Sequence, residues 1–89
     1  MAYKIVYSRH ALKDIKKLDS IIKKKIGKTI TQCSQNPFHY AVKLTSSEIG
    51  NYRWRAGNYR IIFDITGKRI EVLRIGHRSK IYKKSGLRF

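Results

Sequence analysis

NYRWRAGNYR, the stretch at residues 51–60, carries three arginines, two tyrosines and one tryptophan around a Gly-Asn dipeptide. Gly-Asn between two strand-like runs indicates a β-hairpin with a two-residue turn. Such a turn pairs Ala56 with Tyr59 and Arg55 with Arg60. Because successive side chains of a strand point to opposite faces, this register separates the arginines from the aromatic side chains. One face then holds Arg53, Arg55 and Arg60, and the other holds Tyr52, Trp54, Tyr59, Ile61 and Phe63.

A three-residue loop would instead place Arg60 among the aromatic rings. Burying an unpaired guanidinium is costly, so the two-residue turn is favoured. The hairpin is therefore expected to form a cationic face on an apolar backing, an arrangement that suits a polyanion.

The residues before the hairpin predict one strand and two helices. Alternation over residues 3–7 indicates a short, half-buried strand. Apolar side chains at helical spacing over residues 11–18 indicate a first helix. A second stripe over residues 22–33 indicates another, for which Asp19 is the expected N-cap. The first stripe is Ala11, Leu12, Ile15 and Leu18, and the second is Ile22, Ile26, Ile30 and Cys33.

The second helix should end before Pro37, because the residue preceding a proline disfavours the helical backbone. Residues 38–50 have no clear period and are expected to form a connector. Period-two patterns then predict strands at 52–56, 59–65 and 70–76, with a turn at 66–69. The fold class is α+β, with a helical hairpin packed on one face of an antiparallel or mixed sheet.

Composition limits the kind of protein this chain can be. It has 89 residues, expected to form a single domain over residues 1–89, and 21 Lys and Arg against five Asp and Glu give a net charge of +16. A hydrophobic fraction of 42% favours a folded domain over a disordered basic tail. The single cysteine excludes an intrachain disulfide and fits a reducing cytoplasm. No apolar run approaches the ~20 residues of a membrane span, and residues 1–10 do not resemble a signal peptide.

The chain after residue 72 contains no acidic residue and is rich in cations. A helical turn over residues 79–84 would bring Arg78 and Tyr82 together, pairing a phosphate-binding arginine with a tyrosine able to stack on an RNA base. Alternatively, Tyr82 anchors the C-terminal turn on the core and Arg78 is solvated. A single histidine at a strand end is more often structural than catalytic, although the imidazole of His77 suits proton transfer. The cations here are Arg74, Arg78, Lys80, Lys83, Lys84 and Arg88.

The acidic residues argue against a metal-dependent nuclease. Five acids are scattered along the chain, whereas a two-metal site needs several converging carboxylates. His10 and His39 have no partner at metal-ligand spacing, and no cofactor motif is present. We therefore expect neither metal nor cofactor. RNA supplies its own nucleophile in the 2′-hydroxyl, and arginines can align and stabilise that reaction. The run Lys23, Lys24 and Lys25 reads as a solvated helix face that speeds encounter with a polyanion.

RWRAGNYRIIFDI at residues 53–65 and RIEVLRIGHRSKIY at residues 69–82, preceded by YKIVYS at residues 3–8, closely resemble the RelE/ParE superfamily of toxins from toxin-antitoxin systems. The resemblance covers nearly the whole chain. It implies a RelE-like fold, with an N-terminal strand, an antiparallel helical hairpin, a three-stranded antiparallel meander and a short C-terminal helical turn.

The same resemblance implies a toxin that inhibits translation as a ribosome-dependent mRNA endonuclease. Such an enzyme cuts mRNA in the A site without a metal. Its expected partners are the ribosome, mRNA and a cognate RelB-like antitoxin with an acidic and apolar segment.

Residue roles follow from the resemblance. Arg60 and Arg78 would contact the scissile phosphate, and Tyr82 would stack on or orient the neighbouring base. Arg53 and Arg55 occupy the positions of a basic pair on the preceding strand. The further cations and donors expected to bind RNA are Lys43, His77, Lys80 and Lys83.

The general base is an open assignment. RelE itself has lysines where this chain has Arg53 and Arg55, and one of those lysines is implicated as the base. An arginine stays protonated at any working pH. Either His77, Tyr82 or Lys43 accepts the proton, or charge and alignment suffice.

Three other functions remain open. ParE-like members of the superfamily poison DNA gyrase, although they tend to lack the arginine and tyrosine set present here. A non-catalytic basic module that binds RNA or the ribosome is a third possibility. Membrane association ranks last, because neither helix stripe is bulky enough to anchor at a bilayer surface.

Overall fold

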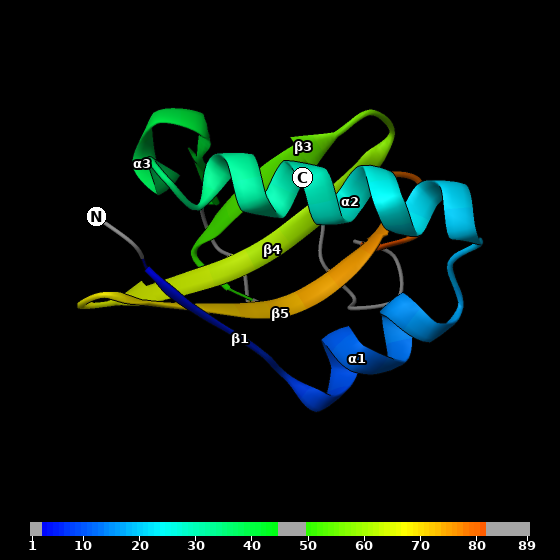
Figure 1. Ribbon diagram of the computed structural model, residues 1–89, viewed down its shortest axis with the longest axis horizontal. Coiled ribbons are helices and arrows are strands. Elements are labelled where there is room, and N and C mark those ends of the chain that lie inside the picture. The colour runs from blue at the N-terminus through cyan, green and yellow to red at the C-terminus, as the bar shows by residue number, and fades with distance from the viewer. Residues whose placement is uncertain (1–2, 45–49, 82–89) are drawn as a thin grey trace.

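In the part of the chain that the structure describes, five strands form one mixed sheet, and two helices cover one of its faces (Figure 1). The computed structural model describes residues 3–44 and 50–81. The strand order across the sheet is β1-β5-β4-β3-β2. In chain order the elements are β1 (Lys4–Tyr7), α1 (Arg9–Lys16), α2 (Ser20–Cys33), α3 (Pro37–Tyr40), β2 (Val42–Lys43), β3 (Tyr52–Ala56), β4 (Tyr59–Thr66) and β5 (Arg69–His77).

The predicted hairpin register is confirmed. β3 and β4 are antiparallel, with Ala56 paired to Tyr59 and Arg55 to Arg60. Gly57 has φ of 62°, a left-handed conformation that glycine adopts without strain. A second two-residue turn, at Gly67-Lys68, joins β4 to β5, so β3, β4 and β5 form the predicted meander.

β1 completes the sheet by pairing in parallel with β5, where Lys4 lies opposite Arg69 and Tyr7 opposite Val72. The sheet is therefore mixed. Beyond Val72, no strand from residues 3–44 or 50–81 pairs with β5 on this side. A bulge opposite Ile62 and Phe63 shifts its register there.

Local side-chain hydrogen bonds start both long helices. The Ser8 hydroxyl accepts from the Ala11 N–H at 3.0 Å at the start of α1. Asp19 does the same for Ile22 at 2.9 Å, which confirms it as the N-cap of α2. α1 packs on β5 and α2 on β3, and the chain reverses between them so that α2 runs back across the sheet (Figure 1).

The connector expected over residues 38–50 contains a helix and a strand in its first part. Pro37 begins the one-turn helix α3, where its missing N–H costs nothing. Val42 and Lys43 then pair with β3 as the short edge strand β2. Segments this short carry too few residues to show a hydrophobic period.

The core lies between the helices and the sheet face that they cover, which we call the helical face. Trp54 is fully buried there, with its ring centroid 4.0 Å from that of Phe63, and its indole N–H donates to the Pro37 carbonyl at 3.2 Å. Cys33 of α2 is also buried, and burial raises the pKa of its thiol, which favours the uncharged form.

A smaller cluster covers part of the opposite face. Ile81 packs with Leu44 and Ile62, and all three are buried. Gly76 of β5 makes room for this contact, since a Cβ there would lie 3.2 Å from the Cβ of Ile81. The chain after β5 therefore folds back over this second face. The second half of the predicted helical turn at residues 79–84, including Tyr82 and Lys83, lies outside the described residues.

Candidate functional site

The three hairpin arginines share the face opposite the helices, which we call the arginine face. The register pairs Arg53 with Ile62 and Arg55 with Arg60, while Trp54 lies on the helical face. Arg55 is exposed and Arg53 is half-buried. Two like charges directly opposite each other on neighbouring strands destabilise a sheet. The Arg55 and Arg60 pair is therefore a place where a bound anion would be stabilising.

Arg60 is buried, with only 5% of its surface exposed. Its Nη1 donates to the carbonyls of Gly57 at 3.0 Å and Tyr59 at 3.1 Å. These acceptors compensate the loss of water around the guanidinium. Arg60 thus holds the turn from within, and only part of the predicted cationic face is open to solvent.

Arg78 lies beside the same turn. Its backbone N–H donates to the Asn58 carbonyl at 2.8 Å, which ties the residue after β5 to the end of the hairpin. Its side chain is exposed and forms no hydrogen bond or ion pair within residues 3–44 and 50–81. The exposed guanidinium groups of Arg55 and Arg78 therefore belong to the same end of the sheet.

The described acidic residues form their contacts away from the β3–β4 turn. Asp19 caps α2, Asp14 pairs with Arg74, and Asp64 accepts the Asn51 N–H at 2.7 Å. Asp64 also lies opposite Glu71, toward the other end of the sheet. None of these carboxylates forms an ion pair with Arg55 or Arg78. The turn end is consequently cationic without a neutralising carboxylate among the described residues.

His77 lies on the helical face, opposite Tyr59, with the two ring centroids 5.4 Å apart. The Ser79 N–H donates to Nδ1 at 3.1 Å, and Ser79 Oγ lies 2.7 Å from the same nitrogen. A backbone N–H can only donate, so Nδ1 is the acceptor and the neutral ring carries its proton on Nε2. The lone pair of this tautomer is already engaged, and its hydrogen bonds do not support His77 as the general base.

The other residues expected to bind RNA are dispersed. Lys43 lies on edge strand β2 opposite Tyr52, so its register assigns it to the face away from Arg53 and Arg55. Lys80 follows β5, and its N–H donates to the His77 carbonyl at 2.9 Å.

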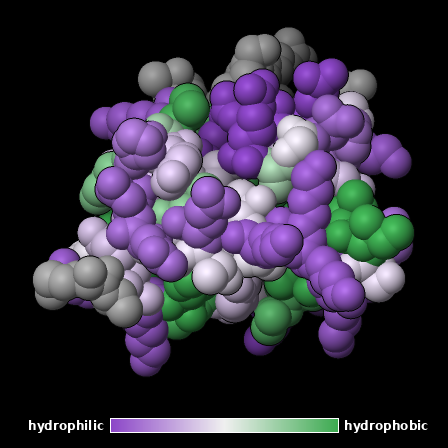
Figure 2. Space-filling model, turned by 45° about the horizontal axis from the view of Figure 1, so that its top comes forward, coloured by the Kyte–Doolittle hydropathy of each residue, from purple (hydrophilic) through white to green (hydrophobic). Residues whose placement is uncertain are grey.

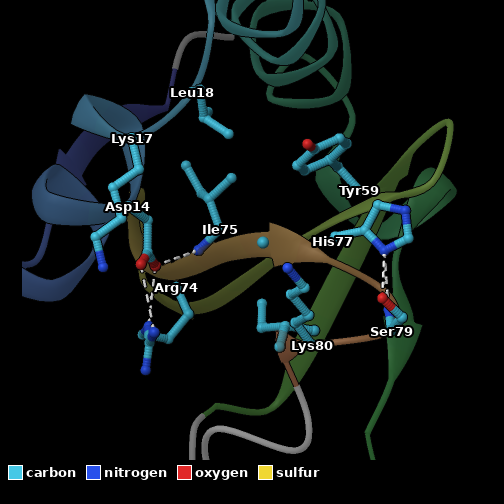
Figure 3. Close-up of a pocket in the computed structure, with 11 residues that line it drawn as sticks. Asp14, Lys17, Leu18, Tyr59, Arg74, Ile75, His77, Ser79 and Lys80 are labelled. Atoms are coloured by element: carbon cyan, nitrogen blue, oxygen red, sulfur yellow. Dashed lines mark hydrogen bonds and ion pairs between the residues drawn. The ribbon is translucent and has the colours of Figure 1, made fainter.

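A pocket of about 390 Å³ lies between α1 and the end of β5. Figure 3 shows the ion pair of Asp14 and Arg74 on one side and the rings of Tyr59 and His77 on the other. The Asp14 carboxylate accepts hydrogen bonds from Arg74 Nε at 2.9 Å and Nη2 at 3.3 Å. It also accepts one from the Ile75 N–H at 2.9 Å. This carboxylate therefore fastens α1 to the part of β5 that lies beyond β1.

The role of Asp14 was not recognised from the sequence, although a signal was present. Asp14 falls within the apolar stripe predicted over residues 11–18, three residues after Ala11 and four before Leu18. A carboxylate inside an apolar helix stripe predicts a buried partner, because an unpaired charge there is costly.

Two further observations describe residues 3–44 and 50–81. No group of three or more His, Cys, Asp or Glu in these ranges could hold a metal ion. No helix in them is long and apolar enough to cross a membrane. Figure 2 shows mainly hydrophilic side chains on the face that it presents, with separate hydrophobic patches.

Comparison with known proteins agrees with this architecture. Residues 5–82 match the family described as ParE toxin of type II toxin-antitoxin system, parDE. Toxin RelE3 of Methanocaldococcus jannaschii is 32% identical over 83 residues, covering 89% of this chain and 94% of that toxin.

Solved structures share the fold. A chain of the RelBE2 toxin-antitoxin complex from Mycobacterium tuberculosis has a TM-score of 0.79 at 23% identity, covering 88% of this chain and 100% of that chain. The RelB-RelE antitoxin-toxin complex from Methanococcus jannaschii gives a TM-score of 0.68 at 29% identity, covering 86% and 94% respectively. The family match and the similarity to Toxin RelE3 show that this chain belongs to the ParE toxin family, within the RelE/ParE superfamily of type II toxin-antitoxin toxins.

Proposed function

We propose that this toxin is a ribosome-dependent endoribonuclease that cuts mRNA in the A site and so inhibits translation. In the proposed reaction the ribose 2′-oxygen attacks the adjacent phosphorus and its proton is released. The bond from phosphorus to the 5′-oxygen then breaks, and that oxygen takes up a proton. The products are one fragment ending in a 2′,3′-cyclic phosphate and one beginning with a 5′-hydroxyl.

The observation that carries this proposal is the cationic end of the β3–β4 hairpin. Arg55 and Arg78 are exposed there, and no described carboxylate pairs with them. Two guanidinium groups on a rigid sheet end can align a phosphodiester and stabilise the negative charge that develops on it. Arg60 stabilises the turn through its hydrogen bonds to the carbonyls of Gly57 and Tyr59. Its direct contact with the phosphate stays a prediction.

The proposed reaction needs a group that accepts the proton of the 2′-hydroxyl. A guanidinium is a poor base, and the Nδ1 of His77 already accepts the Ser79 N–H. Lys43 lies on the face away from Arg53 and Arg55, and Tyr82 lies outside the described residues, so its part in the proton transfer stays a prediction. We infer that catalysis relies on charge and alignment, with the ribosome completing the site. This explains why the proposed cleavage depends on the ribosome.

A cognate antitoxin is the expected partner. Both solved structures compared above are complexes of a toxin with its antitoxin. A chain of +16 requires a partner segment with acidic residues to neutralise it, and apolar residues to bury surface.

The family match supports a second candidate function. The matching family is described as the ParE toxin of parDE systems. Inhibition of DNA gyrase is the alternative function that the resemblance to this superfamily implies. It predicts trapped complexes of gyrase with cleaved DNA, and mRNA that stays intact.

The two functions separate in a translation extract with a defined mRNA, by mapping the 5′ ends of the fragments. Cuts within codons are expected from the wild-type protein. Arg78→Ala and Arg55→Ala should each lower the cutting rate by about 10²–10³, the usual effect of removing one group that stabilises an oxyanion.

Arg69→Ala is the matched control, because Arg69 is an exposed arginine at the opposite end of β5. Its cutting rate should stay close to that of the wild type. Intact mRNA together with trapped gyrase-DNA complexes would contradict RNA cleavage. An equal loss of activity in all three variants would show that net charge, and not the turn end, matters.

A further inference from the structure

Lys25 of α2 differs from the neighbouring lysines in its position. A Cβ placed on Gly57 would lie 2.7 Å from the Lys25 Nζ and 3.3 Å from its Cε. The end of this side chain therefore lies directly over the backbone of the β3–β4 turn. The sequence alone grouped Lys25 with Lys23 and Lys24 as a solvated face, and the contact with Gly57 singles it out.

Both carbonyls of the turn already accept a hydrogen bond, while its peptide N–H groups are left as donors for an external ligand. Its Gly57 carbonyl accepts from Arg60 at 3.0 Å, and its Asn58 carbonyl accepts from the Arg78 N–H at 2.8 Å. The backbone N–H groups of Gly57 and Asn58 meet no acceptor within residues 3–44 and 50–81, and neither does the Lys25 ammonium. One ammonium and two peptide N–H groups thus lie at this turn without an acceptor from the described residues.

We propose that Lys25, with the N–H groups of Gly57 and Asn58, forms a second phosphate-binding site for single-stranded RNA at the tip of the hairpin. Backbone N–H groups in a turn, combined with a lysine, are suited to an oxyanion. Single-stranded RNA carries one phosphate per nucleotide, so a strand held at Arg55 and Arg78 presents a neighbouring phosphate to the turn. This site rests on the proposed function for its ligand, and it adds a residue and a binding position to it.

The competing explanation is that Lys25 only adds to the diffuse positive field of α2. Lys24 provides the matched control, because it is an exposed lysine on the same helix. The comparison is between Lys25→Gln and Lys24→Gln, which remove the same charge from adjacent positions.

Gly57→Asn supplies an independent perturbation. Asparagine tolerates the left-handed backbone better than most residues, and its Cβ would displace the Lys25 ammonium. If Lys25 acts from this position, Gly57→Asn should reproduce the loss caused by Lys25→Gln, and the double variant should lose little more. Circular dichroism and a thermal melt establish that each variant is folded, and the two lysine variants still decide if Gly57→Asn does not fold.

The measurement is fluorescence anisotropy of a short single-stranded RNA with the purified toxin at several salt concentrations, alongside 5′-end mapping in the extract. Lys25→Gln should weaken RNA binding about tenfold and reduce the slope of log affinity against log salt by about 0.7. Lys24→Gln should have a much smaller effect on both. Cutting by Lys25→Gln should fall in parallel with binding.

Equal effects of the two lysine variants, or additive effects of Gly57→Asn and Lys25→Gln, would overturn this site. A wild-type protein that binds RNA through Lys25 and leaves mRNA intact would uphold the site and contradict cleavage. A wild-type protein that cuts mRNA while Lys25→Gln behaves normally would overturn the site alone.

Discussion

The alternation of side chains along a strand predicts the face on which Arg60 lies but not its burial. Alternation correctly assigned its face, together with Arg53 and Arg55. Its burial could not be predicted, because the alternation of side chains does not report the turn carbonyls that bind the guanidinium. The turn carbonyls make a buried guanidinium tolerable where an isolated one would not be.

Trp54 provides a stability test at a single side chain. Its indole N–H donates to the buried Pro37 carbonyl, and its ring packs against Phe63. Trp54→Phe keeps an aromatic ring but leaves the carbonyl without its donor, so the free energy of unfolding should fall by about 1–3 kcal/mol. Urea denaturation followed by circular dichroism measures the change.

Phe38 is the control for this substitution. It contacts Tyr52 edge-on but is 55% exposed. Phe38→Leu should change the free energy of unfolding by no more than about 0.5 kcal/mol. A Trp54→Phe protein as stable as the wild type would show that the bond to Pro37 does not anchor α3.

The strands and helices differ in how well the sequence predicts them. The two long helices and the meander β3–β4–β5 were predicted, because each spans enough residues to show its period and its turn or cap. α3 and β2 were not, since they contain four and two residues. The parallel pairing of β1 with β5 joins residues far apart in the chain, so no local pattern reports it.

Asp14 is the tie between α1 and the free end of β5. Asp14→Ala removes the acceptor of the Ile75 N–H and the partner of Arg74. Because both donors are partly buried, the free energy of unfolding should fall by about 2–3 kcal/mol. The Ile75 amide should also lose protection in hydrogen exchange measured by NMR.

Asp14→Asn separates the two contributions. The amide oxygen can still accept the Ile75 N–H, while the charge opposite Arg74 is gone. Protection at Ile75 should largely persist in this variant. Unchanged protection in Asp14→Ala would contradict the assignment of Asp14 as the tie.

Across the protein as a whole, charge is organised by position as well as by amount. The net charge of +16 predicts only that the partner is anionic. The fold adds that Asp64 and Glu71 lie opposite each other away from the turn, while Arg55 and Arg78 lie beside it without an acidic partner among the described residues. The sequence identified these arginines, but the nearness of Lys25 to the turn required the arrangement of α2 over the sheet.

The central claim is that the turn end promotes attack by the 2′-hydroxyl of mRNA. The most direct test is a programmed ribosome with an mRNA that has a single 2′-deoxy nucleotide immediately before a mapped cut. Because this change removes only the nucleophile, the cut at that bond should disappear while cuts at other codons persist. Cleavage that continues at the deoxy position would contradict the account.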